Sequence, residues 1–213
     1  MANSDTYHHG ALRRALMDGA LSVIASQGLS ALSLRAVAAA AGVSHAAPYH
    51  HFADKAALVR AIGYEGLRLL DERMAAAEVA AGDDAGARLL AIGVAYVEFA
   101  AASPAHFAAM SAPDMRTGDE GGEAHGEPWE RLVAAVVACQ RTGLLAPGDP
   151  LVPAVGLWAL VEGLGRLWDG GALAPLPESA DGAASLADRV LTAMLPLMTP
   201  ALPAPARSTR GSR

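Results

Sequence analysis

The chain of 213 residues has little of several residue types, and each shortage narrows what the protein can be. Its single cysteine, Cys139, cannot form a disulfide within the chain and lies in an apolar run, where a buried thiol is expected. No stretch offers about 20 uninterrupted apolar residues, so no membrane span is expected. The first residues lack the pattern of a signal peptide. These shortages predict a cytoplasmic protein.

The sequence also lacks the common motifs of catalytic and metal sites. It contains no His-Glu-x-x-His, no paired Cys-x-x-Cys, no glycine-rich phosphate loop and no Gly-x-Ser-x-Gly elbow. The adjacent pairs His8-His9 and His50-His51 do not share a helix face, as metal ligands three or four residues apart would. We therefore expect no enzymatic activity, no cofactor and no metal site.

What the chain does contain is alanine and an uneven distribution of charge. Hydrophobic residues make up 53% of the chain and aromatic residues only 5%, and 50 residues are alanine. The net charge is −6, but residues 1–60 carry five basic and three acidic side chains, whereas residues 61–213 carry eleven and nineteen. The only lysine, Lys55, and five of the seven histidines lie in the first segment. This asymmetry is typical of a polyanion-binding module attached to an acidic body.

The spacing of the apolar residues is helical throughout, and no segment shows the alternation expected of a strand. The predicted fold class is therefore all-α, with about nine helices. Residues 112–126, rich in Gly, Asp and Glu, are expected to form a mobile loop, and residues 200–213 a disordered tail. Apolar spacing and cap residues place the helices at 9–27, 34–41, 45–51, 55–82, 85–102, 104–110, 129–140, 151–168 and 186–198.

Residues 33–51 have the features of a helix-turn-helix. Ser33 and Ser44 can cap the two helices, and Gly42 can adopt the left-handed conformation that a tight corner requires. Ala38 is small where the two helices cross. Pro48, at the fourth position of the second helix, removes a backbone hydrogen bond and is expected to shorten or distort that helix. By spacing alone, an ordinary helical hairpin fits equally well.

The identities of the residues are more informative about this motif than their spacing. The runs Ser33-Leu34-Arg35-Ala36-Val37-Ala38, Ala41-Gly42-Val43-Ser44 and Tyr49-His50-His51-Phe52, followed by Asp54-Lys55, resemble the TetR family of bacterial transcriptional regulators. The likeness extends from Tyr7 to about Leu70. A second likeness is weaker: Trp158 to Gly163 looks like the Trp-His-Gly signature of one class of TetR regulatory domains, with Glu162 in place of the histidine.

The resemblance implies a domain organisation and a function. Residues 1–55 would form the DNA-binding domain and residues 56–199 a helical regulatory and dimerisation domain, followed by the tail at 200–213. The protein would be a repressor that binds a pseudo-palindromic operator as a homodimer and is released by a small molecule. The helices near 151–168 and 186–198 would form the dimer interface, and the first of them is apolar nearly all round, which independently calls for a partner.

The second helix of the motif is expected to face base edges in the major groove. His45 is the expected hydrogen-bonding reader in its first turn, because the neighbouring alanines offer only apolar contacts. Family resemblance places phosphate contacts at Tyr49, His51 and Lys55. The DNA-binding candidates are thus Ser33, Arg35, Ser44, His45, Ala46, Ala47, Tyr49, His51 and Lys55.

Aromatic, sulfur and imidazole side chains at helical spacing are the candidate walls of an effector cavity. Such a cavity would suit an apolar or aromatic molecule, although a stripe of this kind is also typical of plain core. The alternative function is a helical small-molecule-binding or interaction protein with a weakened DNA-binding module, which the net acidity favours. The candidate ligand-binding residues are Tyr96, Phe99, His106, Phe107, Met110 and Trp129.

Overall fold

The computed structural model describes residues 3–116, 126–176 and 181–198, and all regular structure in these residues is helical. The all-α class is therefore confirmed. The α-helices are α1 (Asn3–Gln27), α2 (Leu34–Ala40), α3 (Lys55–Ala80), α4 (Ala85–Ala102), α5 (Pro104–Met110), α6 (Gly126–Arg141), α7 (Leu151–Asp169) and α8 (Ala183–Met194). Short 3-10 helices lie at Leu29–Ala31, Ala47–His50, Pro113–Arg116 and Leu195–Met198.

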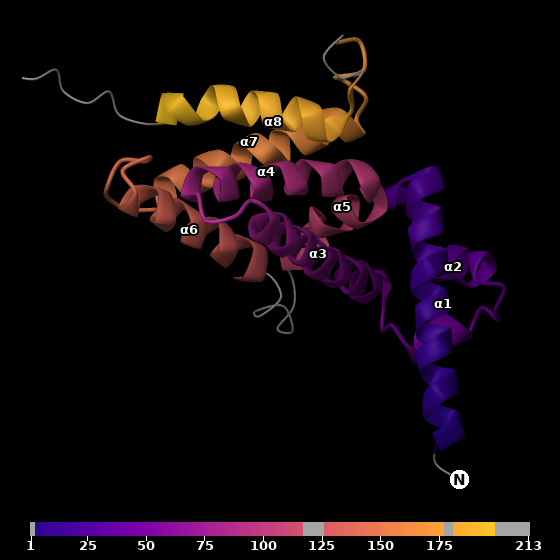
Figure 1. The fold of residues 1–213 in the computed structure, drawn as a ribbon. Coiled ribbons are helices and arrows are strands. Elements are labelled where there is room, and N and C mark those ends of the chain that lie inside the picture. Colours follow the sequence, from indigo (N-terminus) through magenta and orange to yellow (C-terminus); the bar gives the residue numbers. More distant parts are fainter. Residues whose placement is uncertain (1–2, 117–125, 177–180, 199–213) are drawn as a thin grey trace, which may run out of the picture.

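The helices form a small N-terminal lobe and a larger body (Figure 1). Helices α1 and α2 make the lobe, and α3 leads from it into the body. In the body, α4 packs against α3, α6, α7 and α8, so it is the central helix. Helix α5 lies where the two parts meet, because it packs against both α3 and α1.

Side-chain caps fix where two long helices of the body, α3 and α4, begin. Asp54 accepts a hydrogen bond from the backbone N–H of Ala57 at 2.7 Å, and Asp84 does the same for Ala87 at 2.7 Å. Helix α3 ends at Ala80, two residues before Gly82, whose φ of 76° is easily adopted only by glycine. The start of α3 and the whole of α4 therefore lie where the sequence predicts them.

Several predicted segments differ from the structure. The first helix, predicted to begin at residue 9, begins at Asn3. The predicted helix at 45–51 is only a single 3-10 turn, Ala47–His50, so there are eight α-helices in the described residues rather than nine. The predicted loop at 112–126 contains the 3-10 turn Pro113–Arg116 and the start of α6; its residues 117–125 lie outside the described part of the chain, as does the predicted tail. The last helix begins three residues early, at Ala183, and changes to a 3-10 turn after Met194, where Pro196 interrupts it.

Two helices, α4 and α7, are long and apolar enough to cross a membrane by length and composition alone. The central position of α4 accounts for its composition, since it is surrounded by other helices. The buried share of the most apolar window is similar in the two helices, 33% in α4 and 28% in α7. Helix α7 differs because it carries large exposed apolar side chains, among them Val152 and Trp158, whereas α4 carries none. An apolar face of α7 is therefore left without a partner in the single chain.

Candidate functional site

The N-terminal lobe holds the predicted helix-turn-helix. Ser33 caps α2, since its hydroxyl oxygen accepts a hydrogen bond from the N–H of Ala36 at 3.1 Å. Gly42 forms the corner with a φ of 67°, which other residues rarely adopt. The N–H of Val43 then donates to the carbonyl of Ala38 at 3.0 Å and closes the turn. The cap of the first helix and the corner of the motif are thus present as predicted.

The predicted recognition helix is wrong in one respect, because it is a 3-10 turn rather than two turns of α-helix. Pro48 has no N–H to donate to the carbonyl of Ser44, so the first α-helical hydrogen bond cannot form. The N–H of Ala47 donates to that carbonyl instead, at 3.0 Å, and Tyr49 donates to Ala46 at 3.2 Å. The N-cap position of this turn is occupied by Ala46, which has no capping side chain, and not by Ser44 as predicted. Pro48 itself is buried and anchors the turn to the lobe.

Most of the predicted DNA-binding side chains lie on the surface. Tyr49 is 57% exposed, and His45 at the beginning of the turn is also exposed. His51 and Ala47 are half-buried. The remaining exposed candidates are Ser33, Arg35, Ser44 and Ala46.

Lys55 has a structural role in addition to the predicted one. Its ammonium donates hydrogen bonds to the carbonyls of Leu29 at 3.2 Å and Ser30 at 3.4 Å, and its side chain is half-buried. The lysine therefore ties the first turn of α3 to the 3-10 turn between α1 and α2. An ammonium has three N–H donors, so two such bonds leave one for a phosphate.

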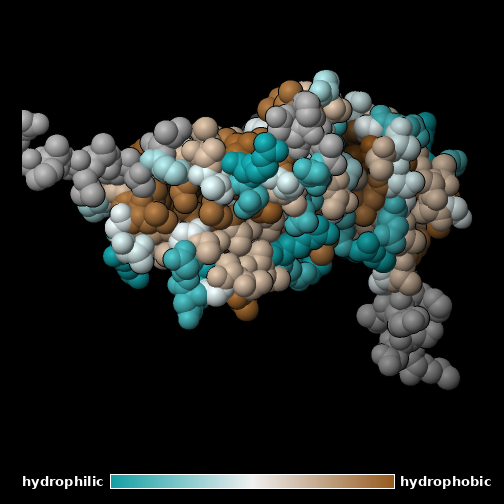
Figure 2. All heavy atoms as spheres, turned by 45° about the horizontal axis from the view of Figure 1, so that its top comes forward, coloured by the Kyte–Doolittle hydropathy of each residue, from teal (hydrophilic) through white to brown (hydrophobic). Residues whose placement is uncertain are grey.

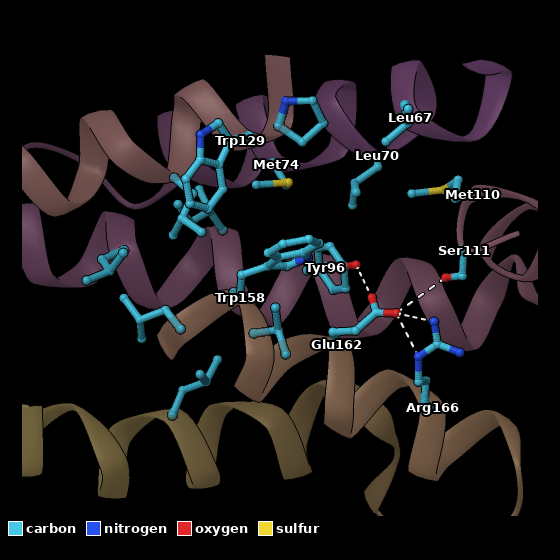
Figure 3. Close-up of a pocket in the computed structure, with 18 of the residues that line it drawn as sticks. Leu67, Leu70, Met74, Tyr96, Met110, Ser111, Trp129, Trp158, Glu162 and Arg166 are labelled. Carbon is cyan, nitrogen blue, oxygen red and sulfur yellow. Dashed lines mark hydrogen bonds and ion pairs between the residues drawn. The ribbon is translucent and has the colours of Figure 1, made fainter. Parts of the chain in front are cut away.

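The body contains a cavity of about 590 Å³ between α3, α4, α6 and α7 (Figure 3). A volume of this size is in the range of small-molecule sites. Its wall is mostly apolar and includes the rings of Trp129 and Trp158, whose centroids are 5.9 Å apart in an edge-to-face arrangement. The other apolar walls are Leu67, Leu70, Met74, Leu89, Ile92, Met110, Ala112, Met115, Pro128, Leu132, Leu157, Val161 and Leu191.

Of the six predicted wall residues, the structure places three at the cavity: Tyr96, Met110 and Trp129. The other three lie elsewhere. Phe99 is buried in the core beneath the guanidinium of Arg73, and Phe107 is buried with its ring edge-to-face to Tyr96. His106 points toward Glu65 of α3, with 3.4 Å between Nε2 and Oε2. Helical spacing shows which residues share a face, but not whether that face meets a neighbour or a void.

The sequence interpretation missed the polar end of the cavity. Glu162 accepts hydrogen bonds from the hydroxyl of Tyr96 at 2.5 Å and from that of Ser111 at 3.3 Å. It also accepts from Nε and Nη2 of Arg166, at 2.8 and 2.7 Å. A signal was present, because Glu162 and Arg166 are the only charged residues between 151 and 168 and stand four residues apart on one helix face.

The Tyr96 hydroxyl stays protonated at any physiological pH. Burial raises its pKa far above the ordinary value, and the negative charge of Glu162 raises it further. Tyr96 is thus a fixed hydrogen-bond donor to the carboxylate of Glu162. The hydrogen bond joins α4 to α7 across one end of the cavity.

Helix α5 connects this cavity to the N-terminal lobe. Ala105, Ala109 and Ala112 are buried in the same core cluster as the apolar residues of α1, α2 and the start of α3. Met110, which lines the cavity, packs on Gly66 of α3. Next to Gly66, Glu65 pairs with Arg14 of α1. Movement of α5 therefore reaches both the cavity wall and the lobe.

Helix α7 also presents large apolar side chains to solvent. Figure 2 shows hydrophobic surface on the helical body. Exposed apolar residues on one chain are ordinary when scattered, but several on a single helix mark an interaction surface. On α7 they are Leu151, Val152, Val155, Trp158 and Leu167, and α8 adds Met194.

Comparison with known families agrees with this arrangement of an N-terminal helix-turn-helix and a helical body with a cavity. Residues 16–62 match the model of bacterial regulatory proteins of the tetR family, and residues 89–194 match the tetracyclin repressor-like C-terminal domain. The chain belongs to the TetR family and is a DNA-binding transcriptional regulator. The finer resemblance to the Trp-His-Gly class stays a prediction. None of the curated proteins matches the chain.

Solved structures share the fold over nearly the whole chain. A protein with unknown function from Rhodococcus sp. RHA1 is 35% identical, with a TM-score of 0.72, over 90% of this chain and 95% of that one. A bacterial regulatory protein of the tetR family from Rhodococcus RHA1 is 21% identical, with a TM-score of 0.72, over 90% and 98%. AibR in complex with isovaleryl coenzyme A and operator DNA is 21% identical, with a TM-score of 0.66, over 87% and 98%.

Proposed function

We propose that this regulator is a repressor that binds its operator as a homodimer and leaves it when a small molecule fills the cavity between α3, α4, α6 and α7. The observation that carries the proposal is the position of α5. Its buried residues Ala105 and Ala109 belong to the core of the DNA-binding lobe, whereas Met110 lines the cavity. One short helix therefore contacts both the ligand site and the DNA-binding unit.

The DNA-binding half of the proposal rests on the exposed turn at the end of the lobe. His45 would read base edges, and Tyr49 and Lys55 would contact phosphates on either side of the groove. Because the 3-10 turn is short and two of its neighbours are alanine, base readout from this element is small. Much of the affinity would then come from phosphate contacts, which makes binding strongly salt-dependent.

The dimer would form through the exposed apolar face of α7, continued by Met194 of α8. Burying this face removes large apolar side chains from water, at about 25 cal/mol per Å². In a two-fold dimer, the recognition turns would lie about 34 to 36 Å apart, one turn of DNA, which requires a pseudo-palindromic operator. The division of the chain into domains at residues 55 and 56 belongs to the same proposal.

The ligand would act by moving α5 relative to α3. Met110 rests on Gly66 and Met115 on Gly63, where α3 has no side chains to hold them apart. A molecule that pushes on Met110 shifts α5, and with it the contacts of His106 and Glu65 that lead to α1. The ligand changes the equilibrium only by its difference in affinity between the two positions of α5. AibR, whose structure contains both isovaleryl coenzyme A and operator DNA, is a precedent for a small molecule on this fold.

The test of the proposed function is an electrophoretic mobility shift with the DNA upstream of the protein's own gene. The full chain is expected to retard this DNA at low salt and to release it as salt rises. A matched DNA of equal length with the same composition in scrambled order serves as control. Equal binding to both, or no binding at low salt, would favour the alternative of a helical ligand-binding protein with a weakened DNA-binding module.

A further inference from the structure

The four residues with polar side chains in the cavity wall form a single hydrogen-bonded cluster at one end of it. They are Tyr96 of α4, Ser111 after α5, and Glu162 and Arg166 of α7. Figure 3 shows the Glu162 carboxylate between Tyr96 on one side and Ser111 and Arg166 on the other. Since the rest of the wall is apolar, this cluster decides which polar group a ligand can carry.

The protein supplies its donors to Glu162 unevenly. One carboxylate oxygen, Oε1, accepts from Ser111 and twice from Arg166, whereas the other, Oε2, accepts only from Tyr96 in the described part of the chain. A carboxylate oxygen accepts about two hydrogen bonds, so Oε2 has room for one more. Tyr96 and Ser111 each use their single O–H on Glu162, and the Tyr96 oxygen is also within reach of the indole N–H of Trp158. The cluster therefore offers Oε2 of Glu162 as an acceptor to a ligand, and its remaining N–H donors are those of Arg166, whose side chain is 57% exposed.

The apolar wall around the cluster contains aromatic rings and polarisable sulfur atoms. Tyr96, Trp129 and Trp158 bring three aromatic rings, and Met74, Met110 and Met115 bring three thioether sulfurs. Aromatic faces attract cations through their quadrupole, most strongly for tryptophan and in sites shielded from water. A wall of this composition together with a carboxylate favours a ligand that carries a positive charge.

The balance of charge points in the same direction. The side chain of Arg166 is 57% exposed and that of Glu162 only 21%, so water screens the guanidinium more than the carboxylate. After burial, the negative charge of Glu162 is the largest cause that raises the pKa of Tyr96, and it is larger than the opposite effect of the Arg166 charge. Residues 61–213 carry eleven basic and nineteen acidic side chains, which draws cations rather than anions toward the body.

We propose that the effector is a lipophilic organic cation, an apolar or aromatic body that carries a protonated amine or a quaternary ammonium group. The cationic group lies between Glu162 and the rings of Tyr96 and Trp158, and the apolar body extends toward Trp129 and Met74. This ligand class rests on the proposed function, because it names the molecule that fills the same cavity. It also gives a reason for a carboxylate at 162, where the resemblance has a histidine.

The test uses compounds that share one apolar body and differ in charge. Binding to the full chain is measured by isothermal titration calorimetry for 4-phenylbutylamine, its trimethylammonium analogue, 4-phenylbutanol and 4-phenylbutyrate, with isovaleryl coenzyme A as a larger anion. The two cations are expected to bind at least about tenfold more tightly than the alcohol, because a charge-assisted hydrogen bond or a desolvated cation–π contact contributes about that much. The butyrate and the coenzyme A thioester are expected to bind more weakly than the alcohol.

Two variants test the cluster itself. Glu162→Gln is expected to bring the affinity for both cations to within about threefold of the alcohol, which keeps its own affinity. Glu98→Gln removes the same charge from an exposed position on α4 and is expected to leave the preference intact. Tyr96→Phe keeps the ring and removes the hydroxyl, so it should weaken the amine more than the trimethylammonium compound. Circular dichroism melting checks that each variant is folded, and Tyr96→Phe serves as the test if Glu162→Gln is not.

The outcomes separate this inference from the proposed function. Three results would each refute a cationic effector. They are tighter binding of the alcohol or of an anion, no binding of the cations at millimolar concentration, and an unchanged preference for cations in Glu162→Gln. If an anion or neutral compound releases operator DNA, the repressor model stands and the cation is refuted. If the cations bind as expected but do not release DNA, the ligand class stands and the regulatory model fails.

Discussion

A methyl group added to Gly66 is predicted to act as a permanent effector. A Cβ at this position would lie 2.8 Å from Sδ and 2.9 Å from Cγ of Met110, and 3.1 Å from Cβ of His106. The Cβ of His106 is fixed to the backbone of α5, so this contact is relieved only by a shift of α5, whereas Cγ and Sδ of Met110 belong to a side chain that can rotate. Gly66→Ala therefore forces α5 away from α3, which is the movement assigned to the ligand.

The effect on stability is the sum of two opposing contributions. Alanine is favoured over glycine inside a helix by about 1 kcal/mol. Overpacking of a tight contact costs about 1 to 3 kcal/mol. The expected net loss is thus about 0 to 2 kcal/mol in the free energy of unfolding, measured by urea denaturation. Operator affinity without any effector is expected to fall by about tenfold, or about 1.4 kcal/mol.

Gly63→Ala is the matched control on the same helix. A Cβ there would overlap the sulfur and terminal methyl of Met115, which form the far end of a flexible side chain. Met115 lines the cavity and can rotate into it, so α5 keeps its place. Operator affinity is expected to stay within about twofold of the unsubstituted chain, while effector affinity falls because Met115 occupies part of the cavity.

Operator affinity is measured by fluorescence anisotropy with labelled DNA at one fixed salt concentration. The double variant Gly66→Ala/Met110→Ala removes the contact with Met110 and is expected to recover part of the lost affinity. If Gly66→Ala binds operator as tightly as the unsubstituted chain, or if Gly63→Ala shows the larger loss, α5 is not the route between cavity and DNA.

Four further predictions concern other parts of the chain. Lys55→Ala is expected to reduce the slope of log affinity against log salt by about one and, through the lost bonds to Leu29 and Ser30, to lower the melting temperature; an unchanged slope would exclude the phosphate contact. His45→Ala should relax base preference at one position per half-site, at a cost of about 1 to 3 kcal/mol, and an intact preference profile would show that His45 reads no base. Val155→Asp on α7 should give monomers in sedimentation equilibrium, whereas Val79→Asp, on an exposed part of α3, should not; dimers in both would place the interface elsewhere. Cys139 is buried and burial raises its pKa, so the thiol stays protonated at neutral pH and should react with a thiol reagent only after unfolding.

Much of the fold follows from local signals in the sequence. Asp54 and Asp84 are good cap residues before apolar helices, and Gly82 and Gly143 can end helices because glycine readily adopts positive φ. These signals act over a few residues, so α4 and the start of α3 could be placed from sequence alone. The burial of Cys139 in an apolar run is also confirmed.

The incorrect predictions lie where a contact between distant residues, or a competing local effect, determines the local structure. The sequence predicts that Pro48 shortens or distorts the second helix of the motif. The outcome, a 3-10 turn in place of a helix, depends on how Pro48 and Phe52 pack into the lobe. The prediction of the cavity wall is correct for three of its six residues. Spacing cannot distinguish a helix face that packs in the core, as at Phe99, from one that borders a cavity, as at Tyr96. Glu162 lies 66 residues from its hydrogen-bond partner Tyr96, and no sequence pattern predicts this pairing.

The proposed function depends on DNA binding by a two-fold dimer that the cavity controls. Selection of bound sequences from a pool of random duplexes, using the full chain at low salt, tests it without knowledge of the operator. The account predicts enrichment of an inverted repeat whose half-site centres are separated by about one helical turn or a multiple of it. Recovery of unrelated sequences, or of single half-sites without symmetry, would contradict it.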